Sequence, residues 1–185
     1  MKKAKNEHTT IRRIHGAMAD TMPNEADELN RRTELLQAAL SGEDDLGMVV
    51  RAHIVIEHEL QEFVLLAAPN PSELKFKEMD YDEKVRLALV LGLDPELKAA
   101  LKAAGTLRNR FSHKLEMKLG EQEAKNLFAT LTPEHLKTLR TIYTPHLAKE
   151  QNQTLQGASV RDRVQMFFML IFSQVFAQAD ARKLL

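Results

Sequence analysis

The 185-residue sequence contains no cysteine. Disulfide bridges, thiolate zinc sites, iron–sulfur clusters and cysteine nucleophiles are therefore excluded. The sequence also lacks an excess of charge of either sign, because 26 Lys and Arg residues balance 26 Asp and Glu residues. A protein that coats nucleic acid is usually basic. The balance argues against broad nucleic-acid binding and leaves room for a local basic site.

Long apolar runs are missing too. The longest run, Met166 to Phe172, falls far short of the roughly 20 residues that a membrane-spanning helix needs. The basic residues 1–5 are not followed by an apolar stretch, so a secretory signal is not indicated. We therefore expect a cytoplasmic protein without a membrane contact.

Glycine and proline are few, seven and six residues, and apolar residues recur at helical spacing over long stretches. The pattern predicts an all-α fold, a helical bundle of four to five core helices with additional short helices. Residues 1–23 are expected to form an N-terminal arm or a loosely attached helix. Residues 24–185 are expected to form a single helical-bundle domain, a length that allows a substantial core.

Capping and breaking residues predict where the helices begin and end. Gly92 should close a helix in the left-handed conformation, and Asp94-Pro95 should open the next. Gly105 is expected to interrupt or cap that helix, and Pro145 to end a later one. The predicted helices cover residues 24–40, 46–68, 82–91, 95–104, 106–119, 121–131 and 133–144, with a last helix after Ser159.

The last predicted helix, from Ser159 onward, is apolar nearly all round. A helix of this kind is buried centrally or covered by a partner. The first interpretation is the core of the bundle. The second is a homodimer interface, because a small domain cannot easily hide every face of one helix. A membrane anchor is the weakest of the three.

The segment His53–Glu59 is superficially similar to the helix of zinc proteases. Those proteins place two histidines four residues apart, whereas His53 and His58 are five apart, about 140° around a helix. His53 and Glu57 are four apart and could touch, but two ligands are too few for zinc. A structural polar pair on a core helix is favoured. The acidic pair Asp44-Asp45 is explained by a helix start.

The hexapeptide Arg108–His113 is the most informative feature of the sequence. On a helix, Leu107 and Phe111 share the buried stripe, while Asn109 and His113 stack four residues apart on another face. Arg108 stands next to that face. An amide, an imidazole and a guanidinium are thereby brought close together.

These three groups suit metal-free RNA cleavage. A histidine can accept the proton of a 2′-hydroxyl near neutral pH, and an arginine can stabilise the charged phosphorane. No metal and no other cofactor is required. The alternative is a solvated helix face, with His113 hydrogen-bonded near the core.

The surroundings of the hexapeptide are locally basic within a neutral protein. Only Glu96 and Glu116 interrupt the positive charge of this stretch. The basic residues are Lys98, Lys102, Arg108, Arg110, Lys114 and Lys118. We take Arg108, Arg110, Lys114 and Lys118 as candidates for binding RNA phosphates.

Arg-Asn-x-x-x-His on a helix resembles the signature of the HEPN superfamily (higher eukaryotes and prokaryotes nucleotide-binding). Residues 44–66, followed by Lys84–Leu93 and then the hexapeptide, look like the helical order of its mannitol-repressor-like branch. The resemblance covers residues 35–130 and leaves the N-terminal arm unexplained. It implies a four- or five-helix bundle that is often a dimer.

In active HEPN ribonucleases, the Arg and His of two subunits form a composite, metal-independent site. The resemblance thus implies that Arg108 binds phosphate, that His113 is the acid/base and that Asn109 is its polar partner. The implied function is an RNA-directed one, as an endoribonuclease of toxin or defence type. The expected partners are a second copy of the chain, RNA, and an antitoxin or regulatory protein. Many HEPN members are inert, so the alternative is a non-catalytic, mannitol-repressor-like transcriptional regulator that acts through protein contacts.

Overall fold

The computed structural model describes residues 25–41, 44–113, 117–149 and 157–183. No strand occurs in these ranges, so the predicted all-α helical bundle is confirmed. The helices are α2 (Glu25–Leu40), α3 (Asp45–Ala67), α4 (Tyr81–Val90), α5 (Leu97–Ser112), α6 (Glu121–Phe128), α7 (Pro133–Lys149) and α8 (Val160–Arg182). Two short 3-10 turns, η1 (Pro71–Glu73) and η2 (Phe76–Glu78), lie between α3 and α4.

The chain divides into two compact units, residues 1–35 and residues 36–185. The described part of the first unit is the N-terminal portion of α2. The predicted arm, residues 1–23, lies outside the described residues. The second unit contains the core and every candidate site residue.

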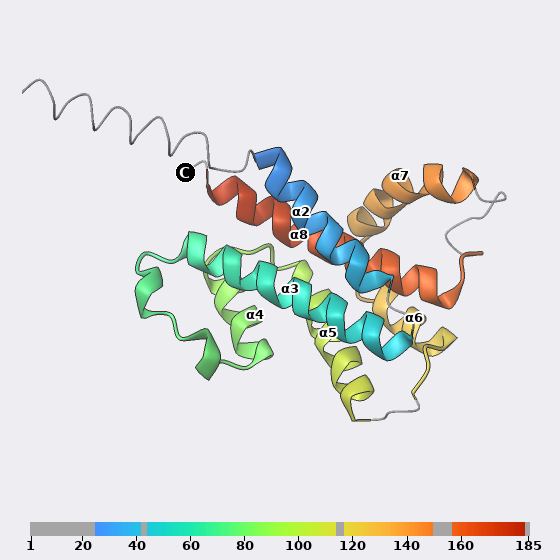
Figure 1. Ribbon diagram of the computed structural model, residues 1–185, viewed down its shortest axis with the longest axis horizontal. Coiled ribbons are helices and arrows are strands. Elements are labelled where there is room, and N and C mark those ends of the chain that lie inside the picture. The colour runs from blue at the N-terminus through green and yellow to red at the C-terminus, as the bar shows by residue number, and fades with distance from the viewer. Residues whose placement is uncertain (1–24, 42–43, 114–116, 150–156, 184–185) are drawn as a thin grey trace, which may run out of the picture. The chain divides into compact units, whose positions relative to one another are not determined.

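Helices α3 and α8, each 23 residues long, share the most extensive contact of the second unit. Helices α5, α6 and α7 also pack on α8. Helix α4 packs on α3 and α5, and in the view of Figure 1 α4 and α5 lie on the same side of α3. Helix α3 therefore has α8 and the α4–α5 pair as its neighbours.

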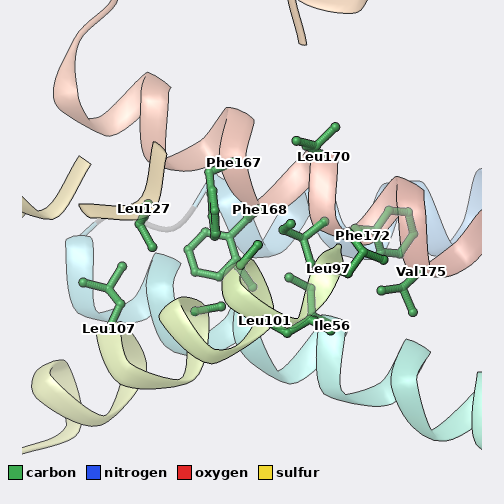
Figure 2. Packing of buried hydrophobic residues seen from close by; sticks show 14 of the residues in the cluster. Ile56, Leu97, Leu101, Leu107, Leu127, Phe167, Phe168, Leu170, Phe172 and Val175 are labelled. Carbon is green, nitrogen blue, oxygen red and sulfur yellow. The ribbon is translucent and has the colours of Figure 1, made fainter. Parts of the chain in front are cut away.

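Helix α8 is the apolar centre of the bundle. Phe167 and Phe168 are completely buried and meet edge to face, with their ring centroids 5.8 Å apart. Figure 2 shows both rings between α8 and α5, in the space that Leu97 and Leu101 also enter. Among the described helices only α8 is long and apolar enough to cross a bilayer, and half of its apolar stretch is buried inside the protein. Its interpretation as a core helix is confirmed.

Side-chain caps explain where three helices begin. Asp44 accepts a hydrogen bond from the Gly47 backbone N–H at the start of α3. Ser159 likewise accepts from the Asp162 N–H at the start of α8. Asp80 forms a reciprocal capping box at the start of α4. The Asp44 and Ser159 caps were predicted from the sequence, because short polar side chains satisfy the free N–H groups of a first turn.

The turn between α4 and α5 is fastened to the end of α8. Gly92 has a φ of +97°, the left-handed conformation that its position after a helix predicts. The Arg182 guanidinium donates to the carbonyl oxygen of Leu91 at 3.0 Å. Asp94 donates its N–H to Oε1 of Gln178 at 2.8 Å. These bonds hold the α4–α5 turn against the last turns of α8.

Two predicted helix breaks were wrong. Helix α5 runs without interruption through Gly105 and ends at Ser112, so the separate helix predicted for residues 106–119 does not exist. Gly105 is buried in the contact between helices, where the absence of a side chain serves packing. Helix α7 continues through Pro145 to Lys149, although a proline inside a helix removes one backbone hydrogen bond. Helix α6 ends at Phe128, three residues before the predicted end.

Replacing Phe168 by alanine should destabilise the protein by about 3–5 kcal/mol, because a fully buried ring leaves a cavity that the helices cannot close. Urea unfolding measures the loss. The matched control is Val90→Ala, at an apolar residue that is 81 % exposed, and it should stay within about 0.5 kcal/mol of wild type. Equal losses in both variants would contradict the assignment of α8 to the core.

Candidate functional site

The residues of the hexapeptide occupy the last turn of α5 and its cap. Arg108 is half-buried and Asn109 is exposed, and both line a cavity beside the start of α4. His113 is the C-terminal cap residue of α5 and is exposed. It does not line the cavity. The structure therefore brings Arg108 and Asn109 together within one chain and leaves His113 outside their cavity.

The cavity has a volume of about 570 Å³ and a mainly polar lining. Helix α5 contributes the cations Lys102 and Arg108, and the start of α4 contributes the carboxylates Asp80 and Asp82. Charges of both signs thus meet in one small space. Among the residues that the structure describes, the lining consists of Asp80, Tyr81, Asp82, Lys102, Gly105, Thr106, Arg108 and Asn109.

The Arg108 side chain has an unused donor. Its Nε is buried and has no hydrogen-bond partner among the described residues. A buried donor without an acceptor is unfavourable, since it has lost water without gaining a bond. Arg108 also lines the cavity, and a guanidinium can bind an anion such as phosphate through paired hydrogen bonds.

The inner side of the cavity depends on a close contact between α4 and α5. Tyr81 is buried against Gly105, where a Cβ atom would lie only 2.8 Å from two carbons of the Tyr81 ring. The Tyr81 hydroxyl donates to the carbonyl oxygen of Leu101 at 3.0 Å. Glycine is thus needed at position 105 for the Tyr81 ring to lie against the backbone of α5.

His53 lies behind Tyr81 in the interior. Its ring centroid is 4.3 Å from that of Tyr81, and its Nε2 is buried without a hydrogen-bond partner among the described residues. Its Nδ1 is 3.8 Å from Oε2 of Glu57, whose other oxygen accepts from Nζ of Lys84 at 2.6 Å. The predicted contact between His53 and Glu57 is confirmed. It belongs to a larger polar cluster that joins α3 to α4.

The surroundings of His53 keep its ring neutral. Burial, and then the positive charge of Arg108, lower the pKa of His53 from 6.5 to about 4, and Lys84 acts in the same direction. The carboxylate of Glu57 opposes this shift without reversing it. Burial also raises the pKa of the Tyr81 hydroxyl, so this group stays protonated. Among the charged groups around His53, Arg108 lines the cavity, whereas Lys84 and Glu57 do not.

Three other residues were predicted to bind phosphate, namely Arg110, Lys114 and Lys118. Arg110 donates to Oε1 of Glu123 at 2.9 Å and thereby ties α5 to α6. Lys118 is exposed and is not part of the cavity lining, and Lys114 lies outside the described residues. The structure thus leaves Arg108 as the member of this group that lines the cavity.

Six lining residues were not predicted as site residues from the sequence: Asp80, Tyr81, Asp82, Lys102, Gly105 and Thr106. Lys102, Thr106 and Asn109 follow one another at intervals of four and three residues, which is the signal of a shared helix face. The mistaken break at Gly105 concealed it. Asp80 and Asp82 are more than 20 residues away from the hexapeptide, and only the packing of α4 on α5 brings them near it.

Neither a family model, nor a curated protein, nor a solved structure matches this chain. Within the described ranges, no group of three or more His, Asp or Glu side chains is arranged to hold a metal ion. The cavity and the hexapeptide are therefore the features of this chain that indicate a function.

Acidification should weaken the fold through His53. The unfolded chain takes up a proton near pH 6.5, whereas the folded protein resists protonation until about pH 4, so stability falls as the pH drops between these values. Between pH 7.5 and pH 5 this residue should cost about 2 kcal/mol, as measured by urea unfolding. His53→Gln should lose that part of the pH dependence, and His58→Gln, at an exposed position on α3, should retain it. Identical pH profiles in all three proteins would refute the assignment.

Gly105→Ala should destabilise the protein by about 1–3 kcal/mol, because the added methyl group collides with the Tyr81 ring. The sign is informative, since the same change inside an unconstrained helix stabilises it by up to about 1 kcal/mol. Thermal or urea unfolding gives the difference. In a Tyr81→Leu background the penalty should shrink, as a double-mutant cycle would show. An undiminished penalty would mean that the ring is not the obstacle.

Proposed function

We propose that this protein is an RNA-directed, HEPN-like endoribonuclease of toxin or defence type that works without a metal. Arg108 binds the phosphate, His113 is the acid/base, and Asn109 is a polar partner in the site. The resemblance of the hexapeptide to the HEPN signature motivates the assignment. The observation that carries it is the position of Arg108, a half-buried arginine that lines an open cavity on the surface of α5.

The exposure of His113 supports the same proposal. A His113 that was buried and hydrogen-bonded inside one subunit would be unable to reach a substrate. Arg108 and His113 are five residues apart, which corresponds to about 140° around a helix. One chain therefore does not direct both side chains to a single phosphate, and the proposed site needs a second copy of the chain. A homodimer in which Arg108 of one subunit faces the His113 side chain of the other supplies both groups.

The proposed reaction is an internal transfer at phosphorus. The 2′-oxygen of a ribose attacks the adjacent phosphate while His113 accepts the hydroxyl proton. The guanidinium of Arg108 stabilises the charge of the phosphorane. The bond from phosphorus to the 5′-oxygen breaks, and that oxygen takes up a proton. The products are a 2′,3′-cyclic phosphate and a 5′-hydroxyl end.

A second function is favoured by the carboxylates of the cavity. Asp80 and Asp82 would repel the closely spaced phosphates of a nucleic-acid backbone, and His113 does not line the cavity. This arrangement suits a non-catalytic, mannitol-repressor-like transcriptional regulator that works through protein contacts. An antitoxin or regulatory partner belongs to either function, and RNA cleavage distinguishes the two.

RNA cleavage in the presence of EDTA tests the leading proposal. The wild-type protein should release 2′,3′-cyclic phosphate ends. His113→Ala and Arg108→Ala should each reduce the rate at least about 100-fold, the usual contribution of a positioned acid/base or of a charge-stabilising group.

Two variants serve as matched controls. His58→Ala removes an exposed histidine from α3, and Arg110→Ala removes the arginine that is paired with Glu123. His58→Ala should keep the wild-type rate, and Arg110→Ala should lose far less than Arg108→Ala. Equal cleavage by all the variants would point to a contaminating nuclease and remove the proposal. No cleavage by the wild type would favour the regulator.

A further inference from the structure

The cavity beside α4 and α5 has the size of a small-molecule site. Its volume of about 570 Å³ falls within the range of about 300–1,000 Å³ that is usual for such sites. The lining is mainly polar, and Tyr81 is its one aromatic member. Because the Tyr81 ring is already packed on Gly105 and His53, little aromatic surface remains on which a nucleobase could stack.

Helix α5 offers the cavity three side chains that can donate hydrogen bonds, Lys102, Arg108 and Asn109. Thr106 lies beside them in the lining, and its hydroxyl donates to the Lys102 carbonyl oxygen at 2.9 Å. The lone pairs of Thr106 therefore remain free to accept. Two cations together with an amide are suited to bind a phosphate monoester.

The start of α4 offers the cavity fixed acceptors. Asp80 is held by the capping box: Oδ1 accepts from the Glu83 N–H at 2.8 Å, and the Asp80 N–H donates to Glu83 Oε2 at 2.8 Å. Its other oxygen remains available. Asp82 is exposed and lies two residues further on. A carboxylate accepts hydrogen bonds only, so these residues select for a ligand that carries hydroxyl donors.

We propose that the cavity binds a phosphorylated sugar. Arg108 and Lys102 hold the phosphate, and neighbouring hydroxyls of the sugar donate to Asp80 and Asp82. Inorganic phosphate pairs with the cations, but it brings a negative charge close to the two carboxylates. A neutral sugar can donate to the carboxylates but leaves the two cations without an anion. A ligand that carries both a phosphate and sugar hydroxyls pairs with the cations and the carboxylates at once.

The phosphorylated sugar could come from either of two sources. One is the 3′-terminal nucleotide of an RNA strand, whose 2′- and 3′-hydroxyls are both free, and in this form the inference depends on the proposed function. The other is a free sugar phosphate that binds to the same residues without any cleavage. Both ligands carry a 5′-phosphate and neighbouring hydroxyls, so one set of probes tests the cavity and separates the sources.

Isothermal titration of the full-length protein with ribose 5-phosphate, inorganic phosphate and ribose tests the inference. Ribose 5-phosphate should bind at least tenfold more tightly than either of the others. Asp82→Asn should weaken ribose 5-phosphate binding about tenfold and strengthen the binding of inorganic phosphate, because a charged acceptor for the sugar hydroxyls is lost and a repulsion is removed. Lys102→Met should weaken the binding of both phosphates.

Matched controls come from exposed residues outside the cavity lining. Lys98→Met removes a cation one turn earlier on α5, and Glu73→Gln removes an acid from η1. Both should bind ribose 5-phosphate as the wild type does. Circular dichroism establishes that each variant is folded. If the control variants lose as much affinity as Lys102→Met and Asp82→Asn, binding is a property of the general surface charge, and the inference is overturned.

The remaining outcomes decide the ligand and its source. Ribose 5-phosphate that binds no better than inorganic phosphate, or an Asp82→Asn protein that binds both more tightly, overturns the sugar site. Displacement of ribose 5-phosphate by the dinucleotide UpU, but not by its 2′-deoxy form, supports the RNA source. Binding that UpU cannot displace supports a free sugar phosphate. Cleavage of RNA without ribose 5-phosphate binding refutes only this inference, and binding without cleavage refutes only the nuclease.

Discussion

The apolar surface of α8 extends around most of its circumference, and the other helices are arranged so as to cover it. A fully buried helix needs neighbours on several sides, because any apolar face left in water lowers the stability of the fold. Helices α3, α5, α6 and α7 all pack on α8 (Figure 1). The buried residues of α5 face this core and the contact with α4, and its exposed residues Lys102, Thr106 and Asn109 lie on the outer side. The candidate site lies on that outer side, so its position is a consequence of how the core is buried.

Helical periodicity predicted the fold class and most of the individual helices correctly. Local signals were sufficient where one residue decides one boundary, as with the cap at Asp44 and the left-handed Gly92. They failed at Gly105. Glycine interrupts a helix or allows a close approach between helices, and only the position of Tyr81, 24 residues earlier, distinguishes these two roles. A tertiary contact of this kind leaves no local trace in the sequence.

Only part of the candidate site was predicted, because the rest of it is also created by tertiary contacts. Arg108 and Asn109 follow from the hexapeptide, and the structure places both on one cavity. His113 is also exposed, as an external acid/base must be, but it does not line the cavity. Asp80 and Asp82 could not be predicted, because their nearness to Arg108 is created by the packing of α4 on α5. The two carboxylates convert a positively charged helix face into a site with charges of both signs.

The bond between Arg182 and the Leu91 carbonyl joins residues that are 91 positions apart. Together with the contact between α3 and α8, it makes the bundle depend on interactions that are distant in sequence, which slows folding relative to a bundle of local contacts. During synthesis on the ribosome, α3, α4 and α5 emerge well before α8 exists to cover them. Until α8 has been synthesised, their apolar faces stay exposed in a partly folded state, which chaperones can bind and which can aggregate. The turn between α4 and α5 can be fastened by Gln178 and Arg182 only after the chain has been translated through α8.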